Sequence, residues 1–191
     1  MRRVISVCSV TLDGVMQAPG RPDEDTRGGF SHGGWAGPYS DPEQGRRVMQ
    51  GPPNDMLFGR RTYEDFYKVW PHRGDNPFTT VLNARQKYVA SRTLAEPMPW
   101  QNSTLLSGDA AETVAALKAG DGPDLVILGS GDLVRSLTAA GLIDEYRLGI
   151  HPLVMGEGAR LFPEVGPLSK LTLVEAAPSA KGVIQAVYRP A

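Results

Sequence analysis

Two glycine-containing segments follow short apolar runs and precede stretches with helical spacing. The first is 59–62, Gly-Arg-Arg-Thr, after the apolar residues 56–58, and the second is 129–133, Gly-Ser-Gly-Asp-Leu, after 125–128. Glycine permits a tight turn after a strand, and the free amides that begin the next helix attract anions. An adjacent arginine strengthens that attraction. Either segment alone is weak evidence, but together they indicate two phosphate-binding turns.

Neither segment belongs to the best-known nucleotide-binding loops. The chain lacks both the G-x-x-x-x-G-K-[ST] loop of nucleoside triphosphatases and the full G-x-G-x-x-G of a Rossmann domain, which disfavours a kinase or an ordinary dehydrogenase. His32, His72 and His151 have no nearby carboxylate at ligand spacing. The single cysteine, Cys8, lies in an apolar run and is expected in the core. We therefore predict no metal site.

The bulk composition indicates one globular domain spanning residues 1–191. The chain is 41% hydrophobic and 21% charged, with a formal net charge of −1. This balance excludes the basic face of a nucleic-acid-binding protein. The apolar run near the N-terminus is too short and too interrupted by serine for a signal peptide or a membrane span. We expect a cytoplasmic protein without membrane partners.

The hydrophobic pattern predicts alternating strands and helices followed by a hairpin. Strands are expected at 4–10, 56–58, 79–82, 87–90, 104–106, 125–128, 146–150, 171–176 and 183–188, and helices at 41–49, 61–67, from 109 onward and from 133 to 141. Such an order produces a mostly parallel sheet with an antiparallel edge. Ligands of these sheets bind beyond the carboxyl ends of the strands, where both glycine segments fall.

Seven segments together carry a resemblance to a known family. In chain order they are 9–16, 33–35, 57–64, 87–91, 127–131, 141–146 and 152–162. They resemble the dihydrofolate-reductase-like family, in the branch related to the C-terminal reductase domain of the bifunctional deaminase-reductase of riboflavin biosynthesis. The resemblance spans nearly the whole chain. It implies a three-layer α/β/α fold with a mostly parallel central sheet and an antiparallel C-terminal hairpin. The deaminase signature H-x-E…P-C-x-x-C is absent from the sequence.

The resemblance implies NADPH as the reductant. It assigns the adenine-side phosphates to Gly59, Arg60, Arg61 and Thr62, with Arg60 on the 2′-phosphate, aided by Ser91 and Arg92. It assigns the pyrophosphate to Gly129, Ser130, Gly131, Asp132 and Leu133. Asp132 departs from the basic or neutral residue that many relatives have at this position. An acid there is also suited to capping its own helix.

The residues that contact the substrate are less well defined. A folate reductase keeps an acid on its first long helix, and counting back from Gly59 places Glu43 there, with Asp41 close by. Helix capping is the alternative role for both. Asp13, in the turn after the first strand, either contacts the substrate or starts a turn. Three aromatic residues are candidates for stacking on a flat ring or for packing: Trp35, Tyr39 and Tyr63.

These observations lead to three hypotheses of function. The first is an NADPH-dependent oxidoreductase that reduces a pterin- or pyrimidine-like heterocycle, in a riboflavin-pathway-type or dihydrofolate-type reaction. The second is a regulatory module that binds a dinucleotide or pterin without turnover. The third is a structural protein with an emptied cleft, against which the retained Gly59, Arg60, Thr62 and Gly129 argue. The resemblance also implies a homodimer, for which the apolar C-terminal strands offer a surface.

Overall fold

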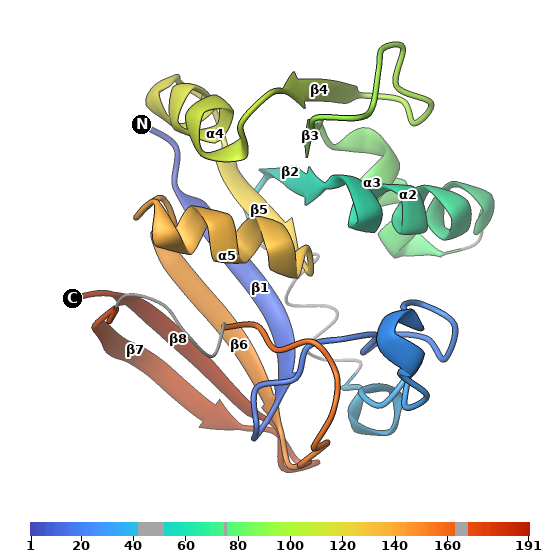
Figure 1. Ribbon diagram of the computed structural model, residues 1–191, viewed down its shortest axis with the longest axis vertical. Helices are drawn as coiled ribbons and strands as arrows, with labels where there is room; N and C mark the ends of the chain where they lie inside the picture. Colours follow the sequence, from blue (N-terminus) through green and yellow to red (C-terminus); the bar gives the residue numbers. More distant parts are fainter. Residues whose placement is uncertain (42–51, 75, 163–167) are drawn as a thin grey trace.

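The computed structural model describes residues 1–41, 52–74, 76–162 and 168–191 (Figure 1). In these parts of the chain, eight strands form one sheet with the order β4-β3-β2-β5-β1-β6-β8-β7. The strands are β1 (Val4–Thr11), β2 (Asn54–Gly59), β3 (Lys87–Ser91), β4 (Ser103–Ser107), β5 (Asp124–Leu128), β6 (Glu145–His151), β7 (Leu171–Pro178) and β8 (Ile184–Pro190). The helices are α2 (Arg60–Val69), α3 (Pro77–Ala84), α4 (Ala110–Ala119) and α5 (Gly131–Ala139), with short 3₁₀ turns η1 (Arg27–Gly29), η2 (Gly37–Tyr39) and η3 (Trp70–His72).

The strand directions confirm the expected sheet. Strands β1 to β6 pair in parallel, whereas β8 runs antiparallel to both β6 and β7. The hairpin of β7 and β8 therefore forms the antiparallel edge of a mostly parallel sheet (Figure 1). The parallel strands place their carboxyl ends along one side of the molecule, where the glycine turns begin.

Helices cover both faces of the sheet because successive strand residues point in opposite directions. In β2, Met56 and Phe58 pack in one cluster with Tyr63 of α2 and Leu82 of α3. The intervening Leu57 packs in a second cluster, whose members include residues of α4 and α5. This arrangement is the three-layer α/β/α fold that the resemblance implied.

One expected strand is wrong. Residues 79–82, Thr-Thr-Val-Leu, lie in helix α3 rather than in the sheet. The β-branched residues favour a strand locally, but a start signal precedes them: the Asn76 side chain accepts a hydrogen bond from the Phe78 N–H, and Pro77 occupies the first helical turn. Packing of Leu82 under the sheet then stabilises the helix. The expected helix at 41–49 falls almost wholly outside the described residues.

Residues 12–41, which follow β1, form a segment that hydrogen bonds and packing hold against the sheet. The Gln17 side chain donates hydrogen bonds to the backbone carbonyls of Asp25 and Arg27 and accepts one from the Ala159 N–H. Phe30 and Trp35 of this segment pack in a small apolar cluster. This segment therefore forms a wall beside the carboxyl ends of the strands.

No helix in the described ranges is long and apolar enough to cross a bilayer.

Candidate functional site

One large cleft of about 1950 Å³ follows the carboxyl ends of the strands. Its first part lies between the turns that follow β2, β3, β4 and β5. Its second part runs over the face of β1, β6 and β8, beside the segment that carries η2. The cleft thus has a turn-lined end and a sheet-lined end.

All residues predicted to bind the dinucleotide line the turn-lined end of the cleft. They are Gly59, Arg60, Arg61, Thr62, Ser91, Arg92, Gly129, Ser130, Gly131, Asp132 and Leu133. The two glycine turns touch each other, because the Gly59 N–H donates to the Ser130 hydroxyl over 3.0 Å. The structure brings these residues together, and their roles toward a cofactor stay predictions.

The backbone of the second turn explains its glycines. Gly129 has a φ of +67°, which favours glycine. A Cβ atom on Gly131 would lie 2.5 Å from Sδ of Met16, so a larger residue would clash there. Ser130 also takes the left-handed conformation, with φ of +54°. The chain therefore tolerates local strain to bring its backbone close to the cleft.

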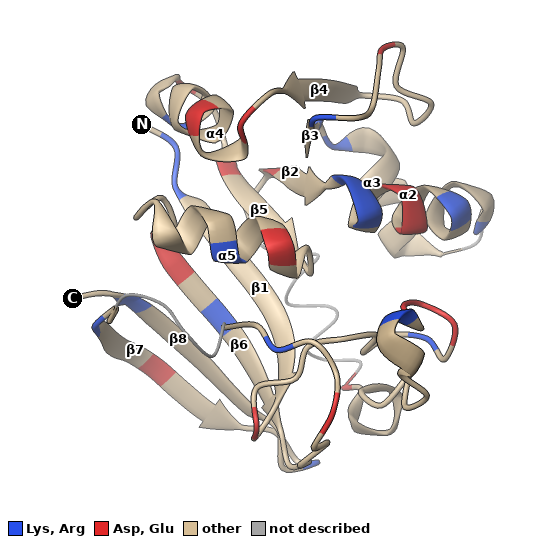
Figure 2. Ribbon diagram, viewed as in Figure 1, with Lys and Arg blue, Asp and Glu red and all other residues tan. Residues whose placement is uncertain are grey.

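The arginines at this end differ in whether an acid already pairs with them. Arg60 pairs with Glu64 at 3.0 Å, and Arg61 pairs with Asp132 at 2.7 Å across the two turns. Figure 2 shows basic and acidic residues side by side on α2 and α5. Arg92 is exposed and has no ion pair with any residue in the described ranges. Of Arg60, Arg61 and Arg92, it is therefore the one most available to a new anion.

Ser91 is occupied within its own turn. Its hydroxyl oxygen accepts hydrogen bonds from the N–H groups of Thr93 and Leu94. The side chain is buried, so it shapes the turn that presents Arg92 to the cleft. The two residues that the resemblance had grouped therefore differ: Ser91 supports the turn, and Arg92 is accessible.

Of the three acidic candidates, Asp41 lines the cleft, whereas Asp13 does not, and Glu43 falls outside the described residues. The Asp13 carboxylate accepts hydrogen bonds from the Thr11 hydroxyl and from the N–H groups of Met155 and Gly156. These bonds, above all the one from Thr11, lower the pKa of Asp13 to about 2. Asp13 therefore stays ionised and joins two turns, so the contacts of this carboxylate in the structure are those of a turn residue, the second of the two roles left open for it.

Two of the three aromatic candidates are packing residues. Tyr63 is 1% exposed; its hydroxyl donates to Ser103 and accepts from the Trp100 N–H. Trp35 is 8% exposed, and its indole N–H donates to the Gln17 carbonyl over 2.7 Å. Neither lines the cleft, so the structure shows both in the packing role, the other of the two roles left open for them. Tyr39 does line the cleft and keeps that interpretation.

The polar residues of the sheet-lined end were not among those predicted from the sequence. Arg147, Gly149 and His151 of β6 line the cleft, together with Gln185 of β8. The three β6 residues recur every second position, so they share one face of the strand. That alternation was visible in the sequence. The pairing of β6 with β8, which adds Gln185, was not visible.

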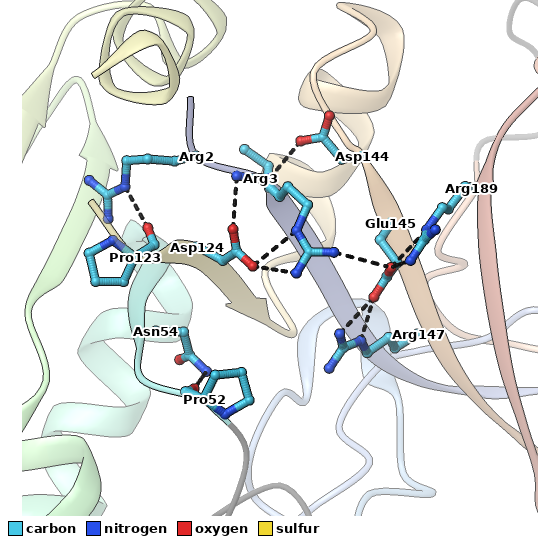
Figure 3. A network of polar contacts seen from close by, with 11 residues as sticks. Arg2, Arg3, Pro52, Asn54, Pro123, Asp124, Asp144, Glu145, Arg147 and Arg189 are labelled. Atoms are coloured by element: carbon cyan, nitrogen blue, oxygen red, sulfur yellow. Dashed lines mark hydrogen bonds and ion pairs between the residues drawn. The ribbon is translucent and has the colours of Figure 1, made fainter. Parts of the chain in front are cut away.

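Arg147 is held in place by a buried carboxylate (Figure 3). Glu145 is 2% exposed and accepts hydrogen bonds from Arg147 at 2.7 Å and from Arg189 at 2.8 Å. Burial raises the pKa of Glu145, but the hydrogen bonds from the two arginines outweigh burial and hold it below its usual value. The cluster keeps a half-exposed, fixed guanidinium at the cleft.

Solved structures share this architecture over nearly the full chain. A putative riboflavin biosynthesis protein from Shewanella sp. PV-4 aligns with a TM-score of 0.70 at 19% identity, covering 99% of both chains. A pyrimidine reductase-like protein from Corynebacterium diphtheriae aligns with a TM-score of 0.62 at 13% identity, covering 100% of this chain and 92% of the other. Dihydrofolate reductase from Enterococcus faecalis, solved with NADP(H), aligns at 0.60 and 15% identity, covering 98% and 96%.

Sequence comparison identifies the family. The protein YyaP of Bacillus subtilis, itself uncharacterized, is 30% identical over 193 residues, which cover 98% of this chain and 94% of YyaP. The family model of the RibD C-terminal domain matches residues 2–185. This chain therefore belongs to the family of the RibD C-terminal domain.

Proposed function

We propose that the protein is an NADPH-dependent oxidoreductase that reduces a small pterin- or pyrimidine-like heterocycle, in a reaction of riboflavin-pathway or dihydrofolate type. One observation carries the proposal: a single cleft joins all residues predicted for the dinucleotide phosphates to a separate polar floor on β6 and β8. The family and its solved neighbours, among them a reductase with NADP(H), support the same chemistry. A non-catalytic binding module is the alternative outcome.

The residues present fit a dinucleotide. The left-handed turn at Gly129 and Ser130 places the N-terminal end of α5 at the cleft, where its backbone amides suit a diphosphate once the Met16 side chain moves off Gly131. Bound NADPH would supply a hydride to the ring of the substrate. The contribution of the chain is to hold the two ligands in contact and to supply hydrogen bonds to them. Among the acidic candidates, we assign proton donation to Asp41, which lines the cleft.

We assign the 2′-phosphate to Arg92, with Arg60 as a second cation that must first leave Glu64. Replacement of Arg92 by alanine is expected to weaken NADPH binding about tenfold or more and to leave NADH binding unchanged, because only NADPH carries that phosphate. Calorimetric titration of both nucleotides measures this. Lys170→Ala, which removes an exposed charge outside the cleft, is the control.

Different outcomes separate the alternatives. Saturable NADPH binding followed by oxidation in the presence of a pterin or pyrimidine acceptor supports the reductase. Saturable binding with no acceptor-dependent oxidation favours the regulatory module. Failure of wild-type protein to bind either nucleotide contradicts the proposed cofactor. Equal loss of NADPH and NADH binding in Arg92→Ala contradicts the assignment of the 2′-phosphate alone.

A further inference from the structure

The side chains of Gln185 and His151 lie close to Gly149 at the sheet-lined end of the cleft. Gly149 of β6 is paired with Gln185 of β8. A Cβ atom on Gly149 would lie 3.4 Å from Nε2 and 3.6 Å from Oε1 of Gln185, and 3.6 Å from Cε1 of His151. The absence of a side chain at Gly149 therefore lets an amide and an imidazole meet at one point of the cleft floor.

The imidazole of His151 has a defined orientation. Its Nδ1 lies 2.9 Å from the Gly149 carbonyl oxygen. Because a carbonyl only accepts, Nδ1 carries the proton, and Nε2 of the neutral ring is an acceptor. Trp35 and Tyr39 contact the ring edge-to-face, with centroids 5.0 and 5.6 Å away. Packing from two sides thus fixes the ring without using Nε2.

The hydrogen-bonding groups of this floor are unused by the described residues. Within those ranges, neither Nε2 of His151 nor the side-chain amide of Gln185 has a hydrogen-bond partner. Arg147 lies on the same face two residues before Gly149. It directs Nε and Nη2 to Glu145, which leaves Nη1 without a described partner (Figure 3). Donors and acceptors therefore converge on the cleft from three side chains.

We propose that Gln185, His151 and Arg147 bind the polar edge of the substrate ring and select a planar heterocycle with a cyclic-amide edge. The inference rests on the proposed function and extends it to specificity. His151 Nε2 accepts from a ring N–H, and Arg147, which only donates, binds the adjacent ring carbonyl. A ring with an amino group in place of the carbonyl puts a donor against Arg147 and no N–H against His151. The Gln185 amide has one donor and one acceptor and can turn over, so it binds either ring and adds affinity without selecting.

Calorimetry with two probes tests the selection. Pterin has the cyclic-amide edge, and 2,4-diaminopteridine is the same ring system without it. Wild-type protein is expected to bind pterin about tenfold or more tightly than the diamino ring, since an unmatched polar group is costly. His151→Phe keeps an aromatic ring against Trp35 and Tyr39, removes Nε2, and is expected to reduce that preference. Gln185→Leu is expected to weaken the binding of both rings and to keep the preference.

A second glutamine of the chain provides the control variant for this test. Gln101→Leu alters a glutamine outside the cleft that donates to the Asn83 carbonyl, and it must retain the preference. The inference is overturned if wild-type protein binds neither probe, or if His151→Phe retains the full wild-type preference. NADPH affinity, measured in the same variants, is expected to be unchanged. If wild-type protein does not bind NADPH, that result counts against the proposed cofactor and not against the ring site.

Discussion

Asp132 places a negative charge where the proposed pyrophosphate must lie. It pairs with Arg61 and with Arg135, so it occupies two cations that a phosphate would otherwise contact. Like charges also repel when the diphosphate approaches. In the free protein, the carboxylate thus takes the place of an anion between the two glycine turns.

Replacement of Asp132 by asparagine is therefore expected to increase the affinity for NADPH and NADH alike, by about two- to fivefold, because the groups are exposed and partly screened. Calorimetric titration measures the change. Asp121→Asn, which removes an exposed acid outside the cleft, is the control. Weaker binding in Asp132→Asn would mean that the carboxylate organises Arg61 for the phosphate instead of competing with it.

Asp13 links the turn after β1 to the segment after β6, and its titration makes that link dependent on pH. Hydrogen bonds lower its pKa to about 2, below the ordinary value of 3.8. A carboxyl whose folded pKa is depressed stabilises the fold above its unfolded pKa, and this stabilisation is lost as the pH falls through the folded value. Asp13→Asn is expected to lower the free energy of unfolding at pH 7.

The difference between wild type and Asp13→Asn should shrink as the pH falls from about 4 to about 2. Urea denaturation at pH 7, 4, 3 and 2 measures it. Asp23→Asn is a suitable control, since that side chain is largely exposed and makes only a 3.5 Å contact with Arg21. A difference that stays constant over the whole pH range would show that the stabilisation does not come from the charge of Asp13.

At the scale of elements, one buried glutamine holds the segment that forms a wall of the cleft. Gln17 makes three hydrogen bonds to backbone groups of that segment and of the segment after β6. Gln17→Leu keeps a similar size and leaves these groups unpaired. We expect the free energy of unfolding to fall by about 2–3 kcal/mol.

Limited trypsin digestion gives a second measurement for Gln17→Leu. Release of the wall should expose the bond after Arg27, which precedes Gly28, and accelerate cleavage there before global unfolding. The exposed glutamine variant Gln101→Leu should be cut at the wild-type rate. If Gln17→Leu is destabilised but is cleaved after Arg27 no faster than at other sites, the residue supports the whole fold and not the wall in particular.

The elements also show which features local sequence can predict. The start of α4 at Asp109 and the turn at Gly59 follow from signals within a few residues, and both were predicted. The run at 79–82 was mistaken because its β-branched residues were weighed above the capping signal of Asn76 and Pro77. At the site, the turn residues were found for the same local reason. The floor around Gly149 depends on the pairing of β6 with β8, which no local pattern contains.

Burial also limited the prediction of the site. Tyr63 and Tyr39 are the same residue type in aromatic-rich segments, yet one lies under the sheet and the other lines the cleft. Tyr63 is drawn inward because its hydroxyl finds two partners in the core. The composition of a segment does not reveal which polar atoms will be satisfied, so the role of each aromatic was left open between stacking and packing.

At the scale of the whole molecule, the sheet ends in an edge that the described residues leave uncovered. All residues of β7 are exposed, including Leu171, Leu173 and Val174. Ile184 of β8, which pairs with Pro178 at the other end of the hairpin, is exposed as well. Isolated monomers usually protect an edge strand with charges or a covering element. An exposed apolar area of this kind is typical of an interface. We propose that a second copy of the chain covers it.

A two-fold homodimer through β7 and β8 would bring the same surface of each copy into contact. Leu173 is 52% exposed and central in this area, so Leu173→Arg would place two positive charges against each other across the axis and is expected to give a monomer. Light scattering during gel filtration measures the mass. Thr172→Arg adds the same charge to the opposite face of β7 and should leave the dimer intact. A wild-type protein with the mass of one chain at high concentration would contradict the dimer, and a dimer in Leu173→Arg would place the interface elsewhere.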